Sequence, residues 1–135
     1  MSEFKAKLDM CWLSKIADFI EETAKAMGCK DSNIIYDLKL AVDEASTNIM
    51  THGKKSQRKD YFMIHMTKVG KEIEVEITDF GKSYPFDQVK LPLENLPLEE
   101  KLKNGFGIGL IKSVTEKAEY KSFPDKNVLR FYKYF

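Results

Sequence analysis

Three groups of polar and glycine residues in this sequence have types and spacings that could support chemistry. The first group is Glu44, Asn48 and His52, which follow one another at four-residue intervals in the stretch AVDEASTNIMTHG. Residues four apart on a helix lie on nearly the same face, about 6 Å apart along the axis, so these side chains would form one polar column. A carboxylate and a carboxamide one turn apart can serve as a base and a metal ligand, although Glu and Asn are also common on exposed helix faces.

The second group is Asp79 and Gly81 in the stretch ITDFGKSYPF, directly after an alternating strand pattern. The chain must turn sharply there, which leaves a carboxylate at the end of the sheet. The glycine can adopt positive φ or let a ligand approach closely. Taken alone, these two residues favour a simple β-turn.

The third group is the run NGFGIGLIKSV, in which Gly105, Gly107 and Gly109 alternate with Phe106 and Ile108. Glycines that lead into a helix expose backbone N–H groups at its N-terminus, where the helix dipole favours anions such as phosphate. The run does not fit a dinucleotide-binding fold, because no strand-then-glycine unit opens the chain and no acidic partner follows at the usual distance. The G-x-x-x-x-G-K-[ST] phosphate loop is also absent from the sequence.

The elements that would position these groups follow from the periodicity of the apolar residues, which is two in strands and about 3.6 in helices. Strand patterns cover residues 4–10, 61–67, 72–78, 119–123 and 128–135. Helix patterns cover residues 12–27, 31–53 and 110–118. Gly28 is a natural C-terminal stop for the first helix, and Asp31 or Ser32 can cap the second. The glutamates at 72, 74 and 76 are more simply a solvent face than a metal site.

This order of elements predicts one α+β domain over residues 1–135, a two-layer sandwich of a mixed, mainly antiparallel sheet with three helices on one face. Residues 82–104 hold three of the four prolines and predict a long loop. Loops of this length in a small domain are usually functional or mobile, so this segment could form a lid.

Composition narrows the class of protein. Hydrophobic residues make up 43% and charged residues 32% of the chain, as in a globular protein. The formal net charge is +1 with both signs interspersed, which excludes a nucleic-acid footprint. The basic cluster at 54–59 is typical of a solvated loop.

The sequence also indicates where the protein works. Without a long apolar run or an apolar signal core, we expect a cytoplasmic protein outside the membrane. Cys11 and Cys29 form no CxxC and favour reduced structural thiols.

The combination of the three groups is more specific than any one of them. In this order, E-x-x-x-N on a helix, D-x-G after a strand, a proline-rich loop and G-x-G-x-G before a helix resemble the GHKL (Bergerat-fold) ATPase superfamily, which includes gyrase and the histidine kinases. The segment from Glu44 to Gly53, E-A-x-T-N-x-x-x-H-G, is similar to the stand-alone anti-sigma-factor serine kinases. The resemblance covers nearly the whole chain. Ser83 replaces the last glycine of the D-x-G-x-G motif, which leaves the path of the chain at the start of the lid open.

The resemblance implies a role for each group. Glu44 would be the catalytic residue that activates the attacking hydroxyl, and Asn48 would hold Mg²⁺ on the phosphates of ATP. Asp79 would accept a hydrogen bond from the adenine amino group, while Gly81 lets the base lie close to the chain. The residues that would border the phosphates and hinge the lid are Gly105, Phe106, Gly107, Ile108 and Gly109.

Two further roles stay open at the level of the sequence. His52 matches a histidine of the same motif and would either approach the phosphates or close the helix. Lys101 and Lys103 lie in the predicted lid and are either phosphate contacts or solvated surface.

The resemblance also implies the activity. We expect an ATP- and Mg²⁺-dependent serine/threonine protein kinase that phosphorylates a STAS-type anti-sigma-factor antagonist, sequesters a sigma factor and forms a homodimer. The alternative is a nucleotide-loaded regulatory binding module with little or no turnover. A detached histidine-kinase domain is disfavoured, because neither His52 nor His65 is followed by the acidic-apolar-basic pattern of a phosphoacceptor helix.

Overall fold

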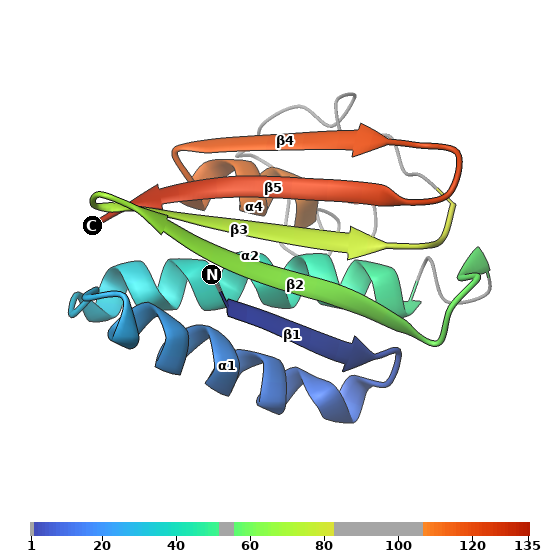
Figure 1. The fold of residues 1–135 in the computed structure, drawn as a ribbon, viewed down its shortest axis with the longest axis horizontal. Helices are drawn as coiled ribbons and strands as arrows, with labels where there is room; N and C mark the ends of the chain where they lie inside the picture. The colour runs from blue at the N-terminus through green and yellow to red at the C-terminus, as the bar shows by residue number, and fades with distance from the viewer. Residues whose placement is uncertain (1, 52–55, 83–106) are drawn as a thin grey trace, which may run out of the picture.

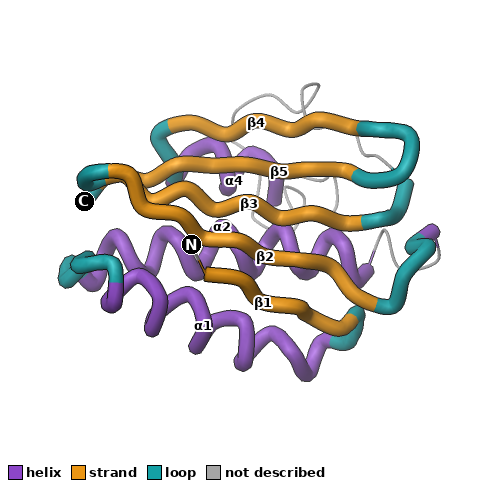
Figure 2. The backbone as a smooth tube through the Cα atoms, in the orientation of Figure 1, coloured by secondary structure: helices purple, strands orange, loops and turns teal. Residues whose placement is uncertain are grey.

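The computed structural model of the protein describes residues 2–51, 56–82 and 107–135. These residues form two layers, a five-stranded sheet with the α-helices on one of its faces (Figure 1, Figure 2). Every ladder between neighbouring strands is antiparallel. The predicted α+β sandwich with a mainly antiparallel sheet is confirmed. In the order of the sheet, the strands are β1 (Ser2–Lys7), β2 (Tyr61–Val69), β3 (Glu72–Asp79), β5 (Asn127–Tyr134) and β4 (Lys117–Ser122).

The first strand ends earlier than its sequence pattern predicts, because a local hydrogen bond after Lys7 replaces the pairing with a neighbouring strand. The Asp9 carboxylate accepts the Cys11 N–H at 3.1 Å and starts the 3-10 turn η1 (Met10–Trp12). Side chains of Asp readily bond to nearby backbone in this way, in competition with a strand ladder. The turn leads directly into α1 (Leu13–Ala26), so the predicted strand at 8–10 is wrong.

The boundary between the first two helices is set by the predicted residues. Gly28 has φ +97°, and the N–H groups of Gly28 and Cys29 donate to carbonyls of the last turn of α1, both at 3.0 Å. This is a Schellman ending, which needs a left-handed residue. The second helix, α2 (Ser32–Thr51), begins after Asp31, whose Oδ1 accepts the Asn33 N–H at 2.8 Å. The helix stop at Gly28 and the cap at Asp31 are confirmed.

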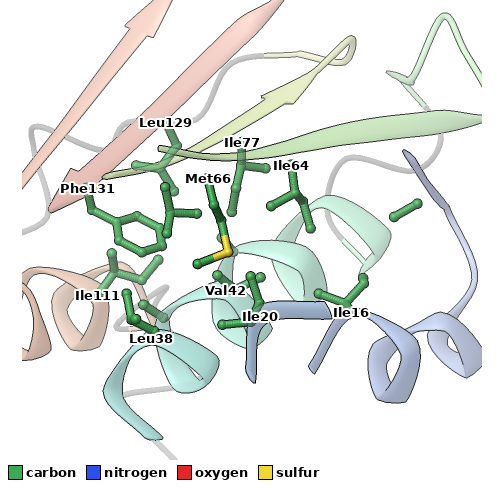
Figure 3. Packing of buried hydrophobic residues seen from close by; sticks show 14 of the residues in the cluster. Ile16, Ile20, Leu38, Val42, Ile64, Met66, Ile77, Ile111, Leu129 and Phe131 are labelled. Carbon is green, nitrogen blue, oxygen red and sulfur yellow. The ribbon is translucent and has the colours of Figure 1, made fainter. Parts of the chain in front are cut away.

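The hydrophobic core lies between the sheet and the helices. Alternate residues of β2 and β3 point into it, and Gly70 with φ +61° forms the hairpin turn between these strands. Figure 3 shows the buried side chains that meet there, which include Ile64, Ile77, Leu129 and Phe131 from the sheet and Ile20, Leu38, Val42 and Ile111 from the helices. Each such side chain contributes about 1.5–3 kcal/mol of hydrophobic stabilisation. This core anchors α2 to the sheet.

The third predicted helix is shifted. It is α4 (Gly107–Val114), so it begins earlier than expected and ends four residues before Ala118, which pairs with Phe131 in the sheet. Its end is fixed by contacts that are distant in sequence. Lys133 Nζ donates to the Val114 carbonyl at 2.8 Å, and the Glu116 N–H donates to a carbonyl of β5 at 3.0 Å.

The face of the sheet opposite the helices carries the predicted row of glutamates. Glu74 and Glu76 lie beside Arg130, with N–O distances of 2.8 and 2.7 Å. The row is therefore a charged outer face whose acidic side chains are partly neutralised. In the ranges that the structure describes, no helix combines the length and the apolar composition needed to cross a bilayer.

Candidate functional site

The polar residues of α2 and the end of β3 lie toward the same end of the molecule. Figure 1 shows the C-terminal ends of α2 and β3 at one side of the sheet. Asp79 is the last residue of β3, and Glu44 and Asn48 lie on α2. The helix that carries Glu44 and Asn48 and the strand that ends at Asp79 thus have their C-terminal ends on the same side, although 35 positions separate Glu44 from Asp79 along the sequence.

Glu44 and Asn48 are half-buried on α2. On the 100° turn per residue of a helix, both lie beside the stripe of Ala41 and Ala45, which is buried. Burial raises the pKa of the Glu44 carboxyl, and the negative charge of the neighbouring Asp43 raises it further. A carboxylate with a raised pKa is a stronger base, as acceptance of a proton from a hydroxyl requires.

Asp79 is a buried carboxylate held by several donors. Its side chain is 5% exposed. Its Oδ1 atom accepts the Gly81 N–H at 3.0 Å, the Asn127 amide at 3.1 Å and the Gln57 amide at 3.3 Å. A buried charge is stable only when it is hydrogen-bonded, so these donors hold the carboxylate at the end of the sheet. The arrangement goes beyond the simple β-turn that the two residues alone favour.

Asn127 is a site residue that sequence analysis missed. It is 1% exposed at the start of β5, and its amide also donates to the Gly81 carbonyl at 2.8 Å. Its own Oδ1 accepts the Ser122 hydroxyl at 2.7 Å. In the sequence it follows Pro-Asp-Lys and is typical of a turn. The only available signal was its place directly before an apolar strand.

The segment 56–58 was also missed, because the sequence shows only a polar loop there. Gln57 Oε1 accepts the Phe80 N–H at 2.9 Å, and the Arg58 N–H donates to the Phe80 carbonyl at 3.1 Å. Ser56 Oγ accepts the Lys82 N–H at 2.9 Å. The segment therefore lies along the residues that follow β3.

The third sequence group is only partly within the described residues. Gly107, Ile108 and Gly109 form the first residues of α4, and Gly109 is buried. Helix α4 packs against α2, so the start of α4 belongs to the helix layer that carries Glu44. The predicted site residues His52, Gly105 and Phe106 lie outside the described residues, as does the predicted lid at 82–104 apart from Lys82.

Asn48 and Asp79 are the described residues that could hold an adenine nucleotide with magnesium. No cluster of three or more His, Cys, Asp or Glu side chains suited to a metal ion occurs in the described part of the chain. Asn48 offers one neutral oxygen, so Mg²⁺ there would take its other ligands from phosphate and water, as this ion usually does. The buried Asp79 carboxylate is a suitable acceptor for an amino group of a base.

The chain matches a known protein family over almost its whole length. It belongs to the histidine kinase-like ATPase domain family, which matches residues 5–133. The predicted GHKL membership is therefore confirmed.

Particular relatives support the serine-kinase branch of this family. The chain is similar to "Serine-protein kinase RsbW" of Bacillus velezensis, with 27% identity over 92 residues that cover 65% of this chain and 58% of that protein. It is also similar to the protein of the same name from Oceanobacillus iheyensis, with 32% identity over 88 residues that cover 61% of this chain and 54% of the relative. The chain thus spans about half the length of these curated relatives. The predicted resemblance to the serine kinases is confirmed.

A solved structure has the same fold. The chain superposes on a chain of the SiaB–SiaC complex from Pseudomonas aeruginosa with a TM-score of 0.67, covering 98% of this chain and 88% of that chain. The sequence identity is 15%, so this likeness concerns the fold alone.

Proposed function

We propose that this protein binds Mg·ATP and transfers its terminal phosphoryl group to a serine or threonine hydroxyl of a STAS-type anti-sigma-factor antagonist. The observation that carries the proposal is the buried, hydrogen-bonded Asp79 at the end of β3, on the same side of the molecule as the C-terminal end of the helix with Glu44 and Asn48. The family match and the relatives named as serine-protein kinases support a kinase.

Each site residue has a role in this proposal. Asp79 accepts the adenine amino group, and Gly81 lies under the base. Asn48 contributes an oxygen to the magnesium ion, which neutralises charge on the phosphates when it is bound. Glu44 accepts the proton of the attacking hydroxyl. Phosphoryl transfer depends mainly on positioning and electrostatic stabilisation, so these few groups are a sufficient set.

The glycine-rich run completes the site. Gly107 and Gly109 at the start of α4, together with Gly105, Phe106 and Ile108, would border the phosphates, and residues 82–104 would close over them. His52 would either approach the phosphates or close α2. Sequestration of a sigma factor, a homodimeric state and a cytoplasmic location are parts of the same proposal.

Two substitutions separate binding from transfer. Asp79→Asn should abolish ATP binding measured by calorimetry, because it removes the charged acceptor. Glu44→Gln should bind ATP normally but lose about 10²–10⁴-fold in transfer from radiolabelled ATP to candidate antagonists, as expected for loss of a general base. Asp18→Asn and Glu22→Gln, at exposed positions of α1, are the matched controls.

The result also decides between enzyme and binding module. Normal ATP binding by Asp79→Asn would disprove the adenine site. Tight ATP binding by the wild type without labelling of any antagonist would favour a nucleotide-loaded module that sequesters its regulator.

A further inference from the structure

The side chain of Gln57 makes two hydrogen bonds of opposite sense at the end of β3. Its Nε2 donates to Asp79 Oδ1 at 3.3 Å, and its Oε1 accepts the Phe80 N–H at 2.9 Å. A carboxylate requires a donor and a backbone N–H requires an acceptor, so the orientation of the carboxamide is fixed by its partners. Gln57 therefore presents a donor and an acceptor, side by side, to this edge of the site.

The same side chain also lies directly on Gly81. A Cβ atom at position 81 would be 2.1 Å from Gln57 Nε2 and 2.9 Å from Ser56 Oγ, and both distances are shorter than the contacts that Cβ atoms make in proteins. The absence of a side chain at Gly81 is what lets Gln57 lie there. The bonds from Lys82 to Ser56 and from Arg58 to Phe80 hold the segment 56–58 in this position on either side of Gln57.

The Watson–Crick edge of adenine has the same pattern, with an amino donor next to a ring-nitrogen acceptor. In the proposed function, on which this inference rests, adenine donates to Asp79 and lies against Gly81. Gln57 takes up both of these contacts. We infer that Gln57 is an internal competitor of the adenine base, and that its carboxamide must leave Asp79 and Gly81 before the base can bind.

The size of the effect follows from the strength of the contacts. Each net hydrogen bond of a half-buried carboxamide is modest, and the apparent dissociation constant of a ligand rises as the fraction of binding-competent protein falls. The bond from Gln57 to Asp79 is long, at 3.3 Å, so the two bonds are assigned to the weak end of the usual range, which corresponds to a population of the competent form of roughly one in five to one in ten. Removal of the competitor should therefore strengthen ATP binding about five- to tenfold.

The test is Gln57→Ala, with ATP affinity measured by calorimetry and the melting temperature measured without nucleotide. We expect the two readouts to move in opposite directions. ATP binds about five- to tenfold more tightly, because the Gln57 carboxamide no longer competes with the base for Asp79 and Gly81. The protein without nucleotide melts at a lower temperature, because two hydrogen bonds are lost. In the wild type labelled with ¹⁵N, the side-chain amide signal that disappears in Gln57→Ala should shift when ATP is added.

The control is Asn33→Ala, which removes an exposed carboxamide at the opposite end of α2 and should leave ATP affinity unchanged. A lower melting temperature for Gln57→Ala together with unchanged or weaker ATP binding would overturn the inference, since a purely structural or base-supporting role gives that result. Asp79→Asn distinguishes this failure from failure of the proposed function. If Asp79→Asn loses ATP while Gln57→Ala binds as the wild type does, only the competitor is wrong. If Asp79→Asn binds ATP normally, the adenine site itself is wrong.

Discussion

Glu44 links the proposed chemistry to pH. Burial first, and then the charge of Asp43, raise the pKa of its carboxyl above the ordinary value for glutamate. Only the ionised form can accept a proton, so the transfer rate should fall as the pH decreases through this raised pKa. In Asp43→Asn the neighbouring charge is gone and the pKa of Glu44 is lower. We predict that the acid limb of the rate profile moves to lower pH in this variant. The profile of transfer rate against pH for both proteins measures the shift.

The same carboxyl gives an independent check through stability. A carboxyl whose pKa is raised by folding favours the folded state in its protonated form, and this contribution is lost as the pH rises through the folded-state pKa. Glu44→Gln, which is neutral at every pH, should therefore raise the free energy of unfolding at neutral pH and lose this advantage in acid.

For the transfer rate, the contradicting outcome is also clear. If the acid limb of the rate profile stays in place in Asp43→Asn, a group other than Glu44 controls the rate.

Asn127 should contribute to stability as well as to the site. Its amide donates to both Asp79 and the Gly81 carbonyl, and it is almost fully buried. Asn127→Ala leaves a buried carboxylate with fewer donors, which should lower the free energy of unfolding by about 1–3 kcal/mol. Urea denaturation measures this loss. Ser122→Ala, which removes one hydroxyl donor to Asn127, should have a smaller effect, and a loss in Asn127→Ala no larger than that of Ser122→Ala would contradict the assigned contacts.

At the level of the elements, the turn between α1 and α2 depends on one backbone conformation. A Cβ at Gly28 would meet nothing closer than 3.7 Å, so space is not the constraint. The constraint is φ +97°, which is unfavourable for residues with a side chain. Gly28→Ala should destabilise the fold by about 1–2 kcal/mol, and Gly28→Asn by less, because Asn tolerates this region better. Thermal denaturation of both variants gives the comparison, and equal losses would show that the backbone conformation is not what matters.

The elements themselves could be predicted because their signals are local. Alternation in β2 and β3 and the helical spacing of α1 and α2 come directly from which side chains face the core. The errors occur where a contact from elsewhere decides. Lys133 and β5 end α4 at Val114, although the apolar spacing continues to Ala118, which lies in β4 instead.

The residues of the candidate site also fall into two groups, those with a local signal in the sequence and those whose role depends on distant contacts. Asp79 and Gly81 could be identified because their motif is contiguous. The contribution of Asn127 could not, because it begins a strand 48 residues away and its partner is known only once β5 pairs with β3. Gln57 likewise could not be identified, because the sequence around it is polar and shows no helix or strand pattern. Its importance depends on the approach of the segment 56–58 to the end of β3.

On the scale of the whole molecule, ligand binding and folding are coupled because the proposed site joins distant parts of the chain. Helix α2, the end of β3 and the start of β5 all contribute to it, and each is held by the common core or by bonds to its neighbours. A nucleotide that binds only to this assembled arrangement must stabilise the entire fold.

The melting temperature should therefore depend on nucleotide. At ATP concentrations about 100 times the dissociation constant, binding adds roughly 2.7 kcal/mol, which for a domain of this size raises the melting temperature by about 6–12 °C. Removal of Mg²⁺ with EDTA should reduce this increase, because the phosphates then lack their counter-ion beside Asn48. GTP should give little increase, since its base presents a carbonyl where adenine presents the amino donor to Asp79. Differential scanning calorimetry of the wild type and of Asp79→Asn tests all three statements. Equal increases in melting temperature for the wild type and Asp79→Asn would mean that ATP binds at a site other than the end of β3.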